Sequence, residues 1–282
     1  MNKTIAINWQ VNTIQQVRLI HALAESDFPV YLPSLEAEKF ILLKEKFALE
    51  LARDSGGEDF TPYLVILHPQ PTTNVGDLSR PLIFPHVITD YCLTLWPERR
   101  EFRYSFQGLM IPPRRILIQD WIDRNLRGKI QLRNPATLIS RIRKKLRKKL
   151  GCDNTEKFRA GDLFVYSSDR GRIFPIKAWD EEYFRILASS QFVLCPGGDY
   201  PWSYRFFESI LCGAIPIIEK YCESYDGFRF HSFTDDITKI KWSLEDAEHN
   251  YRLCVEKLTI PKSILNAELS RLIAIKTTAV SA

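Results

Sequence analysis

The stretch that decides the fold spans Gln191 to Glu219 and reads QFVLCPGGDYPWSYRFFESILCGAIPIIE. An apolar run at 192–195 predicts a buried strand, and a glycine-rich loop follows it. Residues 203–211 predict a helix that is closed by Gly213, and residues 215–218 predict the next strand. Such a strand–loop–helix–strand unit favours an α/β architecture with mostly parallel strands.

The junction between this loop and this helix has the chemistry of an anion site. Gly197 and Gly198 let a ligand approach the backbone closely, and the helix directs its unpaired N–H groups at the loop. Arg205 can fork onto a diphosphate, and Glu208 shares its helix face and can accept hydrogen bonds from ribose hydroxyls. The layout suits a nucleotide diphosphate, although Arg205 and Glu208 would also suit an i,i+3 surface pair.

The same stretch resembles the C-terminal signature of the exostosin-like glycosyltransferases, a family within the GT-B superfamily. The likeness extends weakly to residues 104–108 and to an arginine-containing element at 114–117. The residues that fit the signature in order are Phe192, Leu194, Pro196, Gly198, Ser203, Arg205, Glu208, Gly213, Ile215, Pro216 and Ile218. The resemblance covers about residues 100–220.

This resemblance implies a GT-B-like α/β fold, in which two Rossmann-like domains with mostly parallel sheets face a cleft. The acceptor-side domain would span residues 1–98 and is expected to be reduced, because the chain is short for two complete domains. The nucleotide-sugar domain would span residues 99–282, with its C-terminal helices able to pack back on the first domain. By the same resemblance, Arg205 would hold the diphosphate and Glu208 the ribose, and transfer would be inverting. Together with Gly197, Gly198 and Ser203 of the loop and the helix start, they form the expected donor-binding set.

Charge is distributed unevenly along the 282 residues. Residues 99–150 carry 16 basic and 3 acidic side chains, whereas the segments before and after are both net acidic. A local excess of this size indicates an anionic partner. We find no apolar run that could span a bilayer, no signal peptide and no CxxC pair, so we expect buried thiols rather than disulfides.

Several elements of the N-terminal half are predicted from pattern alone. Residues 35–53 predict one long helix, because they are rich in Leu, Glu, Lys and Ala. The apolar run 64–67 predicts a buried parallel strand, and residues 69–81 predict a long loop. Residues 87–95 fit a strand or a helix equally well.

No metal or other cofactor is expected, because the chain has no Asp-x-Asp motif of the kind that binds a nucleotide diphosphate through a divalent ion. The leaving diphosphate must then be neutralised by cationic side chains and by a helix N-terminus. Arg170, Arg172 and Lys177 could supplement Arg205 in this role, although they would equally suit a solvated loop.

An inverting transfer needs a general base that removes the proton of the acceptor hydroxyl. The candidates, in the order that we favour them, are Asp90, His86 and His68, all expected on loops or strand ends. His68 would follow the parallel strand 64–67, where such sheets place ligands. For each of them alone, a structural role is the competing interpretation.

The predicted helix 138–150 is basic and amphipathic, with Leu138, Ile142, Leu146 and Leu150 on one stripe. It would suit an anionic membrane surface that carries lipid-linked acceptors, an anionic glycan, or simple packing on the core. Nucleic acid is not expected, because no aromatic-interleaved binding module is evident. We expect a cytoplasmic protein that can bind peripherally to the inner face of the membrane.

The sequence therefore favours a hexosyl- or pentosyltransferase that uses a nucleotide-diphosphate sugar, with UDP as the expected nucleotide. The acceptor would be a glycan or a lipid-linked molecule, as in polysaccharide biosynthesis. Two alternatives stay open: a fucosyltransferase-like enzyme that uses a GDP-sugar, and a non-catalytic protein that binds a sugar nucleotide or a glycan.

Overall fold

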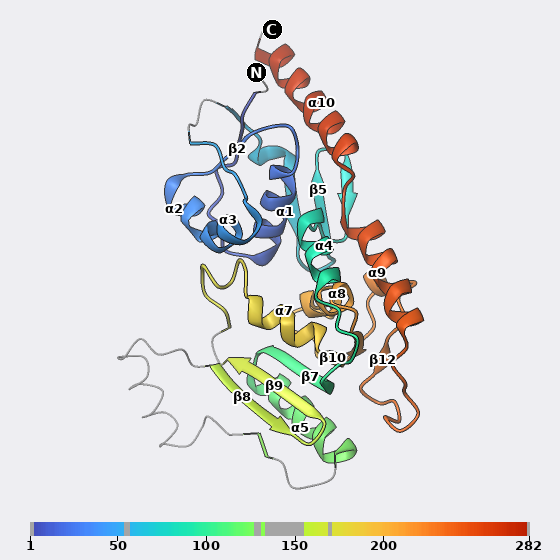
Figure 1. The fold of residues 1–282 in the computed structure, drawn as a ribbon. Helices are drawn as coiled ribbons and strands as arrows, with labels where there is room; N and C mark the ends of the chain where they lie inside the picture. The colour runs from blue at the N-terminus through green and yellow to red at the C-terminus, as the bar shows by residue number, and fades with distance from the viewer. Residues whose placement is uncertain (1–2, 54–56, 127–130, 133–154, 169–170, 281–282) are drawn as a thin grey trace, which may run out of the picture. The chain divides into compact units, whose positions relative to one another are not determined.

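The computed structural model describes residues 3–53, 57–126, 131–132, 155–168 and 171–280 (Figure 1). The chain divides into two compact units. Unit 1 comprises residues 1–94, 173–180 and 252–282, and unit 2 comprises residues 95–172 and 181–251. The first boundary lies close to the expected one at 98/99, but unit 1 also takes segments from the middle and the end of the chain. The expected arrangement of two domains that face a cleft stays a prediction.

Unit 2 is built on a six-stranded sheet in the order β12-β11-β10-β7-β9-β8. Its strands are β7 (Phe102–Leu109), β8 (Thr155–Ala160), β9 (Leu163–Ser168), β10 (Ser190–Cys195), β11 (Ile215–Ile218) and β12 (His231–Ser232). All neighbours are parallel except β8, which pairs antiparallel with β9. The mixed α/β architecture with a mostly parallel sheet is therefore confirmed.

The helices of unit 2 cover this sheet through apolar contacts. They are α5 (Pro112–Asn125), α7 (Glu181–Ala188), α8 (Tyr204–Leu211) and the first part of α9 (Leu244–Leu258). Trp121 and Ile122 of α5 are fully buried against Tyr104 of β7 and Phe192 of β10 in the main core. Each fully buried side chain of this size contributes about 1.5–3 kcal/mol to stability. This core fixes the sheet whose edge carries the site described below.

The helix α8 begins and ends where the sequence pattern predicts. Ser203 is its N-cap, and the Ser203 hydroxyl accepts a hydrogen bond from the Arg205 backbone N–H at 3.2 Å. The chain turns out of the helix at Gly213, whose φ of +73° is a left-handed conformation that favours glycine. The predicted strands at 192–195 and 215–218 are confirmed as well.

Unit 1 contains two small sheets. A parallel sheet has the order β2-β1-β3, and an antiparallel one has the order β4-β5-β6. The strands are β1 (Ile5–Ala6), β2 (Val30–Tyr31), β3 (Glu58–Asp59), β4 (Leu64–Leu67), β5 (Thr72–Val75) and β6 (Leu78–Arg80). The helices are α1 (Ile14–Ala24), α2 (Ser34–Ala37), α3 (Ile41–Phe47), α4 (His86–Thr94) and α10 (Lys262–Val280). Strands of two residues make the parallel sheet a minimal one.

Three expectations for this half of the chain are wrong. The predicted helix 35–53 is broken into α2, a 3-10 turn and α3, which ends where Ala48 takes a left-handed φ of 52°. The run 64–67 pairs antiparallel with β5, and half of its side chains are exposed, so it is not a strand covered on both faces. The predicted loop 69–81 contains β5 and β6, because Thr72–Val75 alternates partly and fully buried side chains.

Unit 1 contains a buried histidine, His21, that is compatible with the folded state only when its imidazole is neutral. His21 lies on α1 with 2% of its surface exposed, and Arg18 of the same helix donates to the Ala178 carbonyl at 3.0 Å. Burial, together with the positive charge of Arg18, lowers the pKa of His21 from 6.5 to about 3. The folded state therefore keeps this imidazole neutral, while the unfolded state gains a proton below pH 6.5.

We predict that the unfolding free energy of the protein falls as pH drops from 6.5 to 4, by up to about 1.4 kcal/mol per pH unit from this group. In His21→Leu the fall over this interval should be smaller, as measured by urea denaturation at several pH values. His249→Leu, on α9, is the matched control for the loss of a histidine side chain. Equal slopes for wild type and His21→Leu would contradict the assignment.

Candidate functional site

The strand order of unit 2 creates a natural binding position between β7 and β10. From β7 the chain passes by α5 toward β9 on one side, whereas from β10 it passes by α8 to β11 on the other side. Ligands of open α/β sheets bind at the carboxyl ends of strands where the order reverses in this way. In this chain those ends are Gln107–Leu109 of β7 and Cys195 of β10.

Arg205 from the first turn of α8 occupies this position. Its side chain is buried, with 7% of the residue exposed, and its Nε donates to the Gln107 carbonyl. Its guanidinium carbon lies 4.6 Å from the centroid of the Phe106 ring. Its Nη1 is buried and has no hydrogen-bond partner among the described residues. A buried cation with an unused donor is poised to bind an anion.

Arg114 from the first turn of α5 lies beside Arg205. Its Nε donates to the Gly197 carbonyl at 2.8 Å and its Nη1 to the Leu109 carbonyl at 3.2 Å. Burial, together with the positive charge of Arg205, lowers the pKa of Arg114 to about 10, although Asp199 and Glu219 act in the opposite direction. Two guanidinium groups therefore lie close enough to repel each other, and an anion between them would relieve that repulsion.

Two glycines make room for these guanidinium groups. Gly108 has a φ of +134°, and a Cβ atom there would lie 2.3 Å from Nη2 of Arg205. A Cβ atom on Gly198 would lie 2.4 Å from Nη2 of Arg114. The expected glycine loop therefore serves first to admit an arginine side chain.

Gln107 adds an uncharged polar group at the same strand end. It is fully buried, and neither its amide nitrogen nor its amide oxygen has a hydrogen-bond partner among the described residues. A buried amide without hydrogen-bond partners lowers the stability of the folded state by about 1–3 kcal/mol. Together with Nη1 of Arg205, this amide is the strongest sign that the strand end is completed by a ligand.

The remaining residues of the expected donor set make contacts within unit 2. The Gly197 N–H donates to Oε2 of Glu219 at 3.0 Å, and the Gly198 N–H donates to the Tyr200 carbonyl at 3.1 Å. The Ser203 N–H donates to the Tyr225 hydroxyl at 2.8 Å. These contacts fix the path of the loop between β10 and α8, so the N–H groups of the two glycines are already engaged.

Glu208 lies one turn after Arg205 and is completely buried. Its Oε2 accepts a hydrogen bond from the Tyr183 hydroxyl of α7 at 2.6 Å. Burial, with the nearby charge of Glu208, raises the pKa of Tyr183 well above its ordinary value, so the phenol stays a donor. The structure thus places Glu208 against α7, and its predicted ribose contact stays a prediction.

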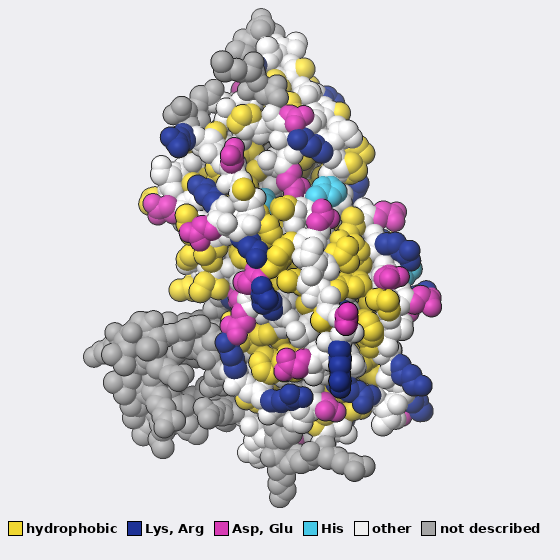
Figure 2. All heavy atoms as spheres, viewed as in Figure 1, with side chains coloured by type: hydrophobic (Ala, Val, Ile, Leu, Met, Phe, Trp, Pro, Cys, Tyr) yellow, Lys and Arg dark blue, Asp and Glu magenta, His cyan; other side chains and the backbone are white. Residues whose placement is uncertain are grey.

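The supplementary cations are not gathered in one place. The Arg172 guanidinium lies 4.0 Å from the centroid of the Tyr183 ring, near Glu208. Lys177 belongs to unit 1, where its Nζ donates to the Asn12 carbonyl at 2.5 Å. Arg170 and the predicted basic helix 138–150 lie outside the described residues. On the face that Figure 2 shows, basic and acidic side chains are interspersed.

The candidate bases belong to unit 1. His86 and Asp90 are one turn apart on α4, not on a loop or strand end as expected, and both line a pocket of about 430 Å³ with Glu25. The two carboxylate oxygens of Glu25 accept the N–H groups of His86 and Val87, each at 2.8 Å, and so cap α4. His68 lies outside this pocket, in the turn that joins β4 to β5. Its expected place at the end of a parallel strand is wrong, because β4 is antiparallel.

Two further searches cover only the described part of the chain. Within it, no three His, Cys, Asp or Glu side chains are grouped so as to bind a metal ion. Nor does any helix there combine the length and the apolar character that crossing a bilayer requires.

The fold and the site define a Rossmann-like α/β protein with two arginines at the switch point of its sheet. The family model of the exostosin GT47 domain matches residues 70–227, which is more than half of the chain. The chain therefore belongs to this family of glycosyltransferases, whose activity implies a nucleotide-sugar donor and a glycan acceptor. The resemblance seen in the sequence is confirmed. A comparison with curated proteins gives no match.

Arg114 and Gln107 are site residues that sequence reasoning missed. The element 114–117 was part of the resemblance, but its cation was not assigned to the donor. The position of Arg114 could have indicated a role in the site. Pro112 and Pro113 begin a helix directly after the glycine turn of β7, and Arg114 follows them in the first turn of that helix. Gln107 was missed because nothing in a strand sequence marks an amide that will lack a partner.

We predict that Gly108→Ala destabilises the protein by about 2–3 kcal/mol more than Gly161→Ala. Both positions have a positive φ, but a Cβ atom at Gly161 would meet nothing within 4 Å, whereas one at Gly108 would meet Arg205. Urea denaturation of the two variants measures the difference. Similar losses would show that Arg205 does not depend on the space at Gly108.

Proposed function

We propose that unit 2 binds a nucleotide-diphosphate sugar at the carboxyl ends of β7 and β10, with the diphosphate on Arg205 and Arg114. The observation that carries this proposal is a pair of guanidinium groups at one strand end, where Arg205 bonds to the Gln107 carbonyl and Arg114 to the Leu109 carbonyl. Nη1 of Arg205 is a buried donor without a partner among the described residues. Bidentate guanidinium–phosphate pairs are strong and directional. The N-terminus of α8, which follows the loop, adds a favourable dipole.

The proposed donor is a UDP-sugar and the proposed acceptor a glycan or lipid-linked glycan. Transfer inverts the anomeric centre and needs no metal. As the glycosidic bond to the diphosphate breaks, negative charge grows on the leaving oxygens, and the two guanidinium groups stabilise that charge. A guanine nucleotide is the alternative to uridine, and the same binding measurements distinguish the two.

For the general base, we propose Asp90 first and His86 second. What supports this order over His68 is that Asp90 and His86 line one pocket, whereas His68 lies elsewhere in unit 1. Asp90 is exposed, and an ionised carboxylate can accept the proton of an acceptor hydroxyl. His86 has its Nε2 3.1 Å from the Ile260 carbonyl oxygen, which ties its ring to the chain before α10.

The basic helix that the sequence predicts at 138–150 supports a proposal about membrane attachment. Its cationic face would attract anionic lipid headgroups and bring the enzyme to lipid-linked acceptors. We therefore propose peripheral attachment to an anionic membrane surface.

We predict that Arg114→Gln and Arg205→Lys each weaken UDP binding by roughly 10- to 100-fold, the effect of losing one charged hydrogen bond. Lysine keeps the charge of Arg205 but loses the planar fork. Isothermal titration of UDP into the wild type and the variants measures the effect. Arg124→Gln is the matched control, because Arg124 lies exposed at the other end of α5.

A melting curve beside each titration separates lost binding from lost folding. Arg205 is buried and bonds to the backbone of β7, so Arg205→Lys should lower the melting temperature as well. Arg114 is only half-buried, so Arg114→Gln should lower the melting temperature less. Unchanged UDP affinity in a folded Arg114→Gln protein would contradict the proposed diphosphate site.

We also predict that UDP affinity is the same, within about twofold, in excess EDTA and in millimolar MnCl₂. The positive charge that neutralises the diphosphate is supplied by Arg114 and Arg205. The same titration, repeated in both buffers, measures this. Binding that appears only with Mn²⁺ would show that a metal is needed after all.

A further inference from the structure

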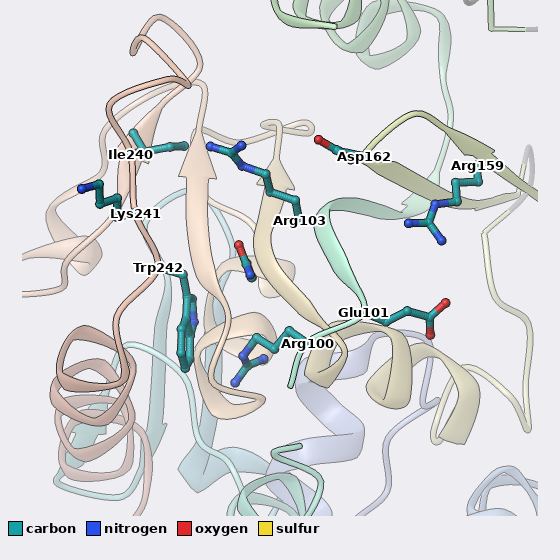
Figure 3. A pocket seen from close by; sticks show the side chains of 9 residues that line it. Arg100, Glu101, Arg103, Arg159, Asp162, Ile240, Lys241 and Trp242 are labelled. Carbon is teal, nitrogen blue, oxygen red and sulfur yellow. The ribbon is translucent and has the colours of Figure 1, made fainter. Parts of the chain in front are cut away.

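A second pocket in unit 2 lies at the opposite edge of the sheet from Arg114 and Arg205. It has a volume of about 540 Å³, within the range of small-ligand sites. Its lining residues flank the amino ends of the parallel strands: Arg100 and Glu101 precede β7, Asp162 precedes β9, and Gln191 lies near the start of β10. Figure 3 labels Arg100, Glu101 and Asp162 among the side chains that line the pocket.

The pocket carries an excess of positive charge. Arg100, Arg103, Arg159 and Lys241 line it, against the two carboxylates of Glu101 and Asp162 (Figure 3). In the described part of the chain, none of the four cations lies within 4 Å of a carboxylate. Their charge is therefore not neutralised by neighbouring side chains.

Arg100 fixes one of these charges deep in the pocket. Only 8% of the residue is exposed, and Nη1 donates to the carbonyls of Ala188 at 2.5 Å and Ser190 at 2.9 Å. Its Nε is buried and has no hydrogen-bond partner among the described residues. A buried guanidinium with an unused donor in a polar pocket is a feature of an anion site, not of a solvated surface.

Trp242 gives the pocket an aromatic wall. Its Nε1 donates to the Gly213 carbonyl at 3.0 Å, and the Arg100 guanidinium carbon lies 4.8 Å from the ring centroid. The ring is thus held in one orientation, and it is only partly buried. A fixed indole next to polar groups suits a ligand that has an apolar face and a polar rim.

The mixture of groups narrows the class of ligand. Four cations would serve a bare phosphate, but Glu101 and Asp162 would repel it, while both can accept hydrogen bonds from hydroxyl groups. A neutral sugar would use the carboxylates and Trp242 but would leave the guanidinium charge unused. We propose that this pocket binds an anionic sugar, whose ring lies against Trp242, whose hydroxyls donate to the carboxylates and whose oxyanion group accepts from the arginines.

The test uses glucose 6-phosphate as the probe and the indole N–H of Trp242 as the reporter. The chain has six Trp residues, and Trp242→Phe assigns the relevant ¹H–¹⁵N resonance. The titration is done with saturating UDP present, so that the switch-point site is occupied if it binds UDP. We expect a saturable shift of the Trp242 resonance, and affinity about tenfold weaker in Arg103→Ala and in Lys241→Ala.

Lys239→Ala is the matched control, because Lys239 is exposed two residues from Lys241 but does not line the pocket. It should keep wild-type affinity for the probe. Arg205→Lys should also keep wild-type affinity for glucose 6-phosphate. The test of this pocket is therefore independent of whether Arg205 binds UDP. No saturable shift, or equal affinity for glucose or for inorganic phosphate alone, would overturn the proposal.

Discussion

The hydrogen bond from Arg205 to the carbonyl of Gln107 joins helix α8 to the end of strand β7, and the site depends on it. The two bonded residues lie 98 positions apart in the chain. They meet because β7 and β10 are neighbours in the sheet, and α8 follows β10. A Cβ atom at position 108 would clash with the guanidinium, and the Ser203 cap stabilises the start of the helix beside it.

Arg114 depends on the same arrangement from the other side. It lies on α5, directly after β7, and bonds to the Gly197 carbonyl in the loop that follows β10. Arg205 bonds from α8 to the end of β7, so the two arginines connect β7 and β10 from opposite sides. The two cations repel each other in the free protein, and their hydrogen bonds to backbone carbonyls keep them in place despite that repulsion. An anionic diphosphate bound between them would attract both guanidinium groups, and the attraction would grow as charge develops on the leaving oxygens, which is a form of electrostatic preorganisation.

Much of unit 2 could be predicted from its sequence, because its elements are strongly patterned. The strand 192–195, the helix beginning after Ser203 and the strand 215–218 all lie where apolar periodicity and glycine signals place them. Unit 1 was harder. Residues 64–67 are apolar like a covered parallel strand, but their partner is the next strand of an antiparallel meander, and pairing partners are set by tertiary contacts. The break near Phe40 and Ala48 has no glycine or proline to signal it.

In the candidate site, too, local sequence patterns predict some residues, while tertiary packing determines the role of others. Arg205 was predicted from its place in the helix and from the family signature. Glu208 shares that helix, but its burial against Tyr183 depends on where α7 packs, which a local pattern does not contain. Arg114 has a local signal in the helix that begins at Pro112, but the order of the strands is what brings it beside the loop after β10. Gln107 and the cationic pocket at the amino ends of the strands also depend on that order.

The central claim is that Arg205 and Arg114 form the diphosphate site of a glycosyltransferase. The measurement that tests it most directly is a crystal structure of the protein grown with UDP. Our account predicts diphosphate oxygens within hydrogen-bond distance of Nη1 of Arg205 and of the Arg114 guanidinium, at the carboxyl ends of β7 and β10. A diphosphate bound elsewhere, with both arginines bonded only to the backbone as they are in the free protein, would contradict it.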